Sequence, residues 1–202
     1  GRVSAKLALP GRHQVIVTLP SAGIDDLLPA GEVLAQEDFT TWVLARDALA
    51  DLPALLHSFG PRVLIGVGGV ERPDEVLEAA EAGAGFVASD YLLPELVAAG
   101  AEPPVVLGGL TPSELRAGLA AGASAVQVTP AGVYRDDVAA LPAMLGFAPL
   151  IARGELTPDQ GREWLEAGAV AVWPRELIGA DLVTGASLGA LRTLLRQWRL
   201  ND

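Results

Sequence analysis

The chain has 202 residues, of which 50% are hydrophobic and 19% are charged, and its formal net charge at pH 7 is −11. This composition indicates a compact globular protein, and the acidic balance argues against nucleic acid and membranes as partners, because both favour clustered Lys and Arg. The absence of cysteine excludes a disulfide framework and thiolate chemistry, and it favours a cytoplasmic location.

The expected strands are eight short apolar runs separated by helical patterns. The runs lack strict alternation, which is typical of parallel strands covered on both faces. In chain order they are 14–19, 40–46, 62–68, 85–89, 104–108, 124–129, 147–152 and 169–173, and a last helix is expected at about 187–199. Eight strands alternating with helices predict an α/β fold, a single-domain (β/α)8 TIM barrel over 13–202, preceded by an arm or tag remnant at 1–12.

Three stretches repeat one helix-to-strand design. Each places a Pro ten residues before the Gly of an Ala-Gly-Ala, so a helix of about ten residues should start at the Pro and stop at the Gly. Thr111 and Thr157, directly before two of these prolines, can cap their helices. An open doubly wound sheet is the alternative fold, but the Gly-rich turn "GVGGVERP" at 66–73 lacks the full G-x-G-x-x-G pattern.

The chemistry of a TIM barrel lies at the carboxyl ends of its strands. In this chain the predicted ends are 18–21, 46–47, 68–71, 89–91, 108–111, 127–130, 153–155 and 173–176. The periodic Ala, Leu and Val residues elsewhere indicate only how the scaffold packs, so the functional residues must lie at these strand ends.

From about Arg62 to Ile178 the chain resembles a known enzyme family. The resemblance rests on "LIGVGGVERPDEVLEAAEAGAGFVAS", "PPVVLGGLTPSELRAGLAAGASAVQVTPAG" and "LIARGELTPDQGREWLEAGAVAV", in order and spacing across five βα units. These segments are similar to the 2-keto-3-deoxy-6-phosphogluconate / 4-hydroxy-2-oxoglutarate aldolases, small class I aldolase barrels. The resemblance implies a barrel, lyase chemistry on sugar acids and a trimeric homo-oligomer. Residues 12–60 match more loosely.

The resemblance places the family's Schiff-base lysine, on strand six, at Gln127 in "QVTPA". An amide nitrogen is delocalised into its carbonyl and is not a nucleophile, so Gln127 cannot form an imine. The one lysine of the chain is Lys6, in the segment before strand one. The covalent mechanism is therefore lost at this position.

Other positions of the family motifs also differ. The acid/base Glu of strand two aligns with Trp42, although the Arg that holds the substrate carboxylate is kept as Arg46. The strand-three Thr becomes Gly69 and the strand-four Pro becomes Asp90. Joint loss of nucleophile and proton shuttle indicates relaxed catalytic demand.

The family's phosphate cradle, made of backbone N–H groups after strands seven and eight, is replaced here by "RGE" at 153–155 and "WPR" at 173–175. We expect Arg46, Arg153 and Arg175 to line the top of the barrel and to bind an anion with their guanidinium groups. Thr129 and Gly108 are further candidates for this ligand site. The alternative is that Arg153 and Arg175 form ordinary surface pairs with Glu155 and Glu176.

No cluster of His, Asp and Glu has metal-ligand spacing, so no metal or other cofactor is expected. His13, before strand one, and His57, in the second helix, should be structural. A carboxylate Mg²⁺ site built from Asp47, Glu71 and Asp90 is the alternative.

Two functions from different classes follow. The first is a catalytically impaired or repurposed aldolase-family barrel that binds a small anionic sugar acid or 2-oxo acid. The second is a lyase that cleaves a 2-keto-3-deoxy (phospho) sugar acid without an imine, with Asp90 or Glu71 as base and a metal to stabilise the enolate. The residue chemistry favours the first.

Overall fold

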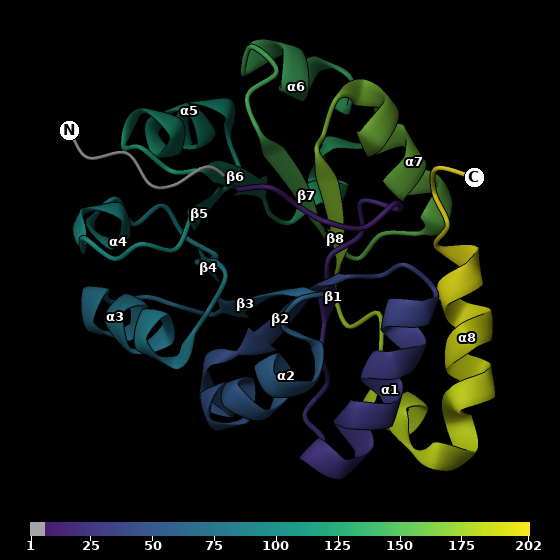
Figure 1. Cartoon of the computed structure of the whole chain (residues 1–202). Coiled ribbons are helices and arrows are strands. Elements are labelled where there is room, and N and C mark those ends of the chain that lie inside the picture. The colour runs from purple at the N-terminus through teal and green to yellow at the C-terminus, as the bar shows by residue number, and fades with distance from the viewer. Residues whose placement is uncertain (1–6) are drawn as a thin grey trace.

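The computed structural model describes residues 7–202, which form one barrel of eight parallel strands in chain order. Lys6 lies outside the described residues. Val15 bridges Val172, and the amide of Ile16 donates to the carbonyl of Val172 at 2.8 Å, which joins the first strand to the last. The predicted (β/α)8 fold is confirmed (Figure 1). The strands are β1 Val17–Thr18, β2 Thr41–Ala45, β3 Leu64–Gly68, β4 Val87–Ala88, β5 Val105–Gly109, β6 Ala125–Val128, β7 Leu150–Gly154 and β8 Ala171–Pro174.

Helices surround the barrel and alternate with its strands (Figure 1). Several are short, and four segments are 3-10 helices. The α-helices are α1 Ile24–Gln36, α2 Leu52–Phe59, α3 Pro73–Ala82, α4 Glu95–Ala98, α5 Pro112–Ala120, α6 Ala140–Met144, α7 Pro158–Ala167 and α8 Leu188–Gln197. The 3-10 helices are η1 Arg46–Asp51, η2 Ala131–Asp137, η3 Ala180–Val183 and η4 Gly185–Ser187. No helix within 7–202 is long and apolar enough to cross a membrane.

The predicted starts and stops of the repeated helices are confirmed. Thr111 accepts a hydrogen bond from the amide of Glu114 at 3.2 Å, and Thr157 accepts one from Gln160 at 3.2 Å, each within a capping box. Gly168 ends α7 at φ +119°, a left-handed conformation that is costly for residues with a Cβ. These local signals fix where each helix turns into the next strand.

The strands bury their two faces in two separate cores. The outer core lies between the strands and the helices, and the inner core fills the barrel with Ile16, Val43, Phe86, Ala88, Val106, Ala125, Ile151, Ala171 and Trp173. Trp42 belongs to the outer core, where its indole N–H donates to the carbonyl of Phe39 at 2.7 Å and its ring meets Phe59 edge to face. Trp42 therefore faces outward and Val43 faces into the barrel, because side chains alternate along a strand.

The seventh strand also differs from its prediction. It was expected at 147–152 and lies at Leu150–Gly154. Gly146 and Phe147 adopt φ of +62° and +56°, which forms a turn that an extended strand cannot contain, and Phe147 is exposed. The shift carries Arg153 into the strand itself.

A buried carboxylate ties the last helix to the first. Glu37 follows α1 and is 6% exposed. Its carboxylate forms ion pairs with Arg192 at 3.1 Å, Arg196 at 3.6 Å and Arg199 at 2.5 Å, all from the α8 region. Burial alone would raise the pKa of the Glu37 carboxyl, but hydrogen bonds from Arg192 and Arg199 and the nearby positive charges outweigh it and lower this pKa.

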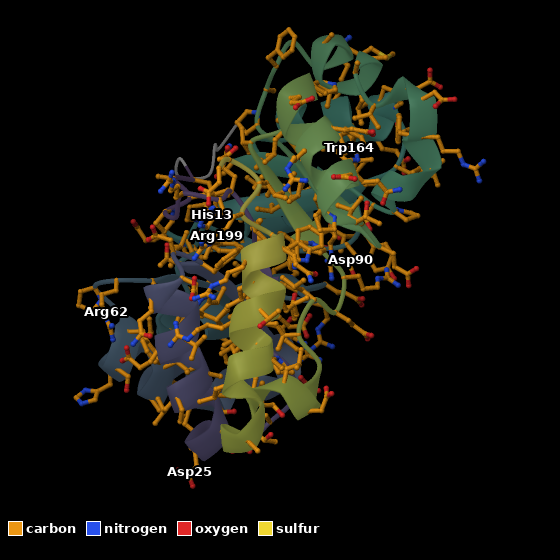
Figure 2. All side chains as sticks on the ribbon, turned by 90° about the vertical axis from the view of Figure 1, so that its right-hand side faces the viewer. His13, Asp25, Arg62, Asp90, Trp164 and Arg199 are labelled. Atoms are coloured by element: carbon orange, nitrogen blue, oxygen red, sulfur yellow. The ribbon has the colours of Figure 1, made fainter. Side chains whose placement is uncertain are left out.

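The chain end lies beside the same contact. Figure 2 shows His13 and Arg199 on the same side of the molecule, opposite Asp90, and burial lowers the pKa of His13, with the charge of Arg199 acting in the same direction. His13 is buried and stacks on Phe39 with 4.8 Å between ring centroids. Arg12 pairs with Asp202 at 3.3 Å, which joins the segment before β1 to the last residue.

We predict that Glu37→Gln lowers the free energy of unfolding by about 2 kcal/mol, because three arginines then lose their charged partner. For a chain of this size the melting temperature should fall by roughly 4–8 °C at pH 7. Since the folded pKa lies below the unfolded one, the contribution of Glu37 is complete above the unfolded pKa and disappears as pH falls through the folded pKa. The two proteins should therefore converge in acid. Glu32→Gln, which removes an exposed partner of Arg62, is the matched control and should melt like the wild type; equal melting of the Glu37 variant would contradict the prediction.

Candidate functional site

The predicted site position on β6 is filled by a buried glutamine. Gln127 points into the barrel, is 0% exposed, and donates from Nε2 to the carbonyl of Ser89 at 2.6 Å. To reach β4 its side chain passes Gly108 on β5, its strand partner. A Cβ at Gly108 would lie 2.2 Å from the Asp90 carbonyl oxygen and 2.9 Å from the Ser89 carbonyl oxygen, so a glycine is needed where the backbone after β4 approaches β5. Gln127 Oε1 is buried without a hydrogen-bond partner among the described residues.

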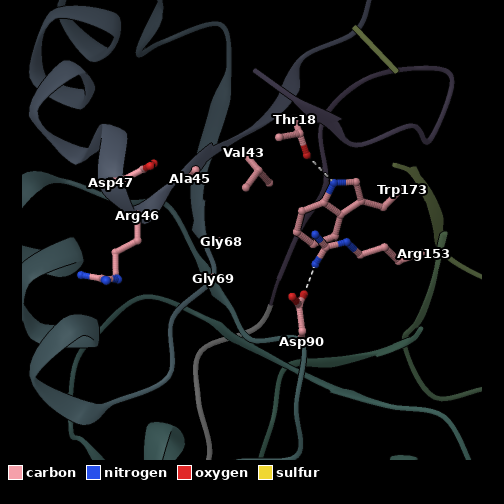
Figure 3. Close-up of a pocket in the computed structure, with 10 residues that line it drawn as sticks. All are labelled: Thr18, Val43, Ala45, Arg46, Asp47, Gly68, Gly69, Asp90, Arg153 and Trp173. Atoms are coloured by element: carbon pink, nitrogen blue, oxygen red, sulfur yellow. Dashed lines mark hydrogen bonds and ion pairs between the residues drawn. The ribbon is translucent and has the colours of Figure 1, made fainter. Parts of the chain in front are cut away.

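A central cavity of about 360 Å³ opens at the carboxyl ends of the strands (Figure 3). Gln127 does not line it. The lining residues are Thr18, Val43, Ala45, Arg46, Asp47, Gly68, Gly69, Asp90, Arg153 and Trp173. They come from the ends of six strands, which is where barrel enzymes bind their ligands.

Trp173 is a buried side chain that lines this cavity. It is 1% exposed, and its indole N–H donates to the hydroxyl of Thr18 at 2.8 Å. In the sheet register Ile151 lies beside Gln127, whereas Arg153 lies beside Trp173, two residues further along the strand. Arg153 therefore stands one layer nearer the barrel mouth than Gln127, and the indole of Trp173 reaches the same level through its contacts with Thr18 and Arg153. Both side chains line the cavity, whereas Gln127 does not.

Arg153 and Trp173 pack as a cation–π pair. The guanidinium carbon lies 4.1 Å from the indole centroid, and Figure 3 shows the two side chains face to face. Nη1 of Arg153 binds the Asp90 carboxylate across the barrel mouth. The side chain is 20% exposed, and its buried Nε has no partner among the described residues. Burial lowers the pKa of Arg153. The Asp90 carboxylate acts to raise this pKa, and the positive charge of Arg175 lowers it further.

Arg46 is turned away from Arg153. Its Nε contacts the buried carboxylate of Glu75 at 2.6 Å, and Figure 3 shows the side chain extending away from Trp173. Glu75 also accepts the amides of Glu71 and Arg72 at 3.0 Å, which caps α3. Arg46 lines the cavity, but its charge is already matched.

Arg175 lies outside the central cavity. It lines a second cavity of about 600 Å³, whose residues are Asp90, Tyr91, Leu92, Gly109, Leu110, Glu114, Thr129 and Arg175. The structure therefore brings Arg46 and Arg153 to one cavity and places Arg175 in the lining of another. The alternative surface pairs are also not formed: Arg153 binds Asp90 rather than Glu155, and no ion pair joins Arg175 to Glu176 among the described residues.

The candidate carboxylates are only partly brought together. Asp47 and Asp90 both line the central cavity, while Glu71 lines neither this cavity nor the second one. No group of three or more His, Cys, Asp or Glu side chains within 7–202 could hold a metal ion. The donor set suited to Mg²⁺ is thus incomplete in the part of the chain that the structure describes.

Sequence reasoning missed two residues near the barrel mouth. Thr18 was inside a listed strand end, but its role as acceptor for Trp173 depends on a contact between β1 and β8. Arg135 lies in η2, beyond the residues that directly follow β6, and its backbone φ of +42° brings it into a third cavity beside Arg175. Spacing alone gives no signal for either contact.

Comparison with known proteins agrees with this architecture. A family model described as KDPG and KHG aldolase matches residues 11–188. Among solved structures, a 4-hydroxy-2-oxoglutarate aldolase/2-deydro-3-deoxyphosphogluconate aldolase from TTHB1 is 27% identical with a TM-score of 0.78, covering 95% of this chain and 96% of that one. A search of curated proteins finds no significant match.

Two further solved structures show the same fold at lower identity. A KDPG aldolase from Legionella pneumophila, with pyruvate captured as a covalent carbinolamine intermediate, is 24% identical with a TM-score of 0.75 and 94% coverage of both chains. A cube-shaped protein cage designed by fusing symmetric oligomeric domains is 23% identical with a TM-score of 0.75, covering 96% of this chain and 71% of that one. With 178 consecutive residues matched by the family model, the chain belongs to the KDPG and KHG aldolase family.

Proposed function

We propose that this family member does not form an imine at β6 and that its central cavity binds a small carboxylate, a 2-oxo acid or a sugar acid, through Arg153. The observation that carries the proposal is the position of Gln127. Its amide cannot act as a nucleophile, and Gln127 is fully buried and does not line the central cavity, with Nε2 committed to Ser89.

The remaining cavity has the chemistry of a small anion site. Its volume of about 360 Å³ falls at the lower end of ligand pockets, which suits a short acid. The guanidinium group of Arg153 is held against the indole face of Trp173. A planar guanidinium fork that is already held in place binds a carboxylate with little loss of side-chain entropy. In the structure the Asp90 carboxylate occupies part of this fork, so a bound ligand would take the place of Asp90.

A lyase that works without an imine is the second candidate. It is favoured by Asp47 and Asp90, two carboxylates that line the same cavity and could remove a proton. Asp90 already forms an ion pair with Arg153, so it would have to leave this contact to act on a substrate proton. We therefore rank this candidate second.

We predict that pyruvate binds the wild-type chain at millimolar concentration and that Arg153→Met weakens binding at least tenfold, since a charged hydrogen bond is lost. Asp90→Asn should tighten binding, because the internal competitor loses its charge. Titration calorimetry measures all three affinities, with Arg162→Met as the matched control on α7.

Failure of pyruvate, 2-oxoglutarate and gluconate to bind at about 10 mM would overturn the binding proposal. A retro-aldol assay on a 2-keto-3-deoxy sugar acid, run with and without Mg²⁺, tests the second candidate in parallel. Turnover that disappears in Asp47→Asn or Asp90→Asn would select the lyase.

We predict that borohydride with pyruvate leaves residue 127 unmodified in the wild type and in Gln127→Lys, because the side chain at this position is covered. In Gln127→Lys combined with Trp173→Ala, the lysine should be reachable and should form a reduced pyruvate adduct. A lysine in this apolar layer also has a lowered pKa, which favours the nucleophilic amine. Peptide mapping by mass spectrometry separates residue 127 from Lys6 and the chain amine. An adduct in the single variant would show that Trp173 and Arg153 do not cover the position.

We also propose a homotrimer in solution, on the basis of the family resemblance. Exposed apolar side chains at Met144 and Phe147, 57% and 65% exposed, offer apolar surface for self-association. Light scattering coupled to size exclusion should give about three times the 20.8 kDa chain mass. A monomer mass across micromolar concentrations would contradict this expectation.

A further inference from the structure

Asp90 lies where two cavities of the barrel mouth meet. It lines the central cavity of about 360 Å³ together with Arg153, and it lines the second cavity of about 600 Å³ together with Arg175. Within 7–202 it is the one residue that these two linings share. Its side chain is 43% exposed, so packing does not lock it in place. One carboxylate is therefore common to two cavities that each contain an arginine.

The structure shows one of the two pairings that this arrangement allows. Asp90 contacts Nη1 of Arg153 in the central cavity (Figure 3). No ion pair among residues 7–202 involves Arg175, although Glu155 lines a third cavity beside it. Burial lowers the pKa of Arg153 and the positive charge of Arg175 lowers it further, so the two guanidinium groups are near enough to interact.

The other carboxylate of the second cavity is already committed to a helix cap. Glu114 accepts hydrogen bonds from the amides of Leu110 and Thr111 at 3.3 Å and 3.0 Å, and from the hydroxyl of Thr111 at 2.8 Å. Hydrogen bonds from Thr111 and Leu110 lower the pKa of Glu114 and hold its carboxylate at the start of α5. Asp90 is therefore the carboxylate of this lining that remains for Arg175.

The backbone around Asp90 is fixed, so a change of partner requires only a rotation of its side chain. The Tyr91 amide donates to the Ser89 hydroxyl at 3.1 Å, and the Gly108 amide donates to the Tyr91 carbonyl at 3.1 Å. The Asp90 carbonyl packs so closely on Gly108 that a Cβ there would lie 2.2 Å from its oxygen. Rotation about χ1 moves a side chain between staggered rotamers, so the carboxylate can leave Arg153 without any movement of β4.

We propose that Asp90 exchanges its partner when a small carboxylate binds in the central cavity: it leaves Arg153 to the ligand and pairs with Arg175 in the second cavity. This inference rests on the proposed function, because the ligand is the anion that takes the guanidinium group of Arg153. The exchange keeps each charge paired, whereas simple displacement would leave Asp90 without a cation at the barrel mouth. Arg175 is then a positioning residue that sets the affinity by holding the displaced Asp90, without touching the ligand.

A double-mutant cycle on pyruvate affinity, measured by titration calorimetry, tests the exchange. Arg175→Met should weaken pyruvate binding about fivefold in the wild-type background, as expected for the loss of one partly exposed ion pair. In the Asp90→Asn background the same substitution should change the affinity by less than about twofold, because a neutral amide needs no cation. An equal loss in both backgrounds would mean that Arg175 attracts the ligand by its charge alone, and no loss in either would mean that it takes no part. Either result overturns the proposal.

Arg116→Met is the charge-matched control for this cycle. Arg116 is an exposed arginine on α5 that lines neither cavity, so its loss changes the net charge as Arg175→Met does and should leave pyruvate affinity unchanged. Arg175 is also exposed, and melting curves should show that both variants remain folded.

An experiment without ligand separates the exchange from the proposed function. In a crystal structure of Arg153→Met the first partner of Asp90 is absent, and we expect the Asp90 carboxylate to contact Arg175 in the second cavity. A carboxylate that stays in the central cavity or points to solvent would overturn the exchange. If this contact forms but pyruvate fails to bind the wild type, the two-partner behaviour of Asp90 is supported and the binding proposal fails alone. If pyruvate binds but the cycle shows no coupling, the exchange fails alone.

Discussion

The stacking of the Arg153 guanidinium on the Trp173 indole determines what the barrel mouth can hold. Trp173 is fixed at its far edge by Thr18, and Arg153 is fixed at its other end by Asp90, so a chain of contacts from β1 to β4 crosses the barrel axis. Gln127 is fully buried and does not line the central cavity. A ligand in this cavity would therefore meet the side chains of Arg153 and Trp173 rather than that of Gln127.

The barrel interior favours an uncharged side chain at position 127. A lysine at this fully buried position would carry the cost of a buried charge. An uncharged amide bound to a backbone carbonyl avoids that cost. Val43 on the inward face of β2 fits the same apolar interior. Gln127 and Val43 thus both keep the barrel interior uncharged.

The scaffold could be predicted from the sequence because its signals are local. Prolines, capping threonines and Ala-Gly-Ala stops act within one helix, and they located the repeated units well. The site was harder because it depends on contacts between distant strands. Apolar residues fill both faces of β2, so the sequence did not show that Val43 faces inward, and the turn at Phe147 moved the start of β7. Arg46 pairs with Glu75, and Arg153 pairs with Asp90. Both carboxylates come from other βα units, so the spacing of residues in the sequence does not predict these pairs.

The influence of Arg175 on Arg153 has a thermodynamic consequence. The charge of Arg175 reaches the guanidinium of Arg153, so it also reaches an anion bound there. An anion held by Arg175 would neutralise that charge and remove its attraction for a second anion in the central cavity. By linkage the penalty must be the same in both directions. Two anionic ligands at this face would thus bind with negative cooperativity, and screening by salt would weaken that coupling.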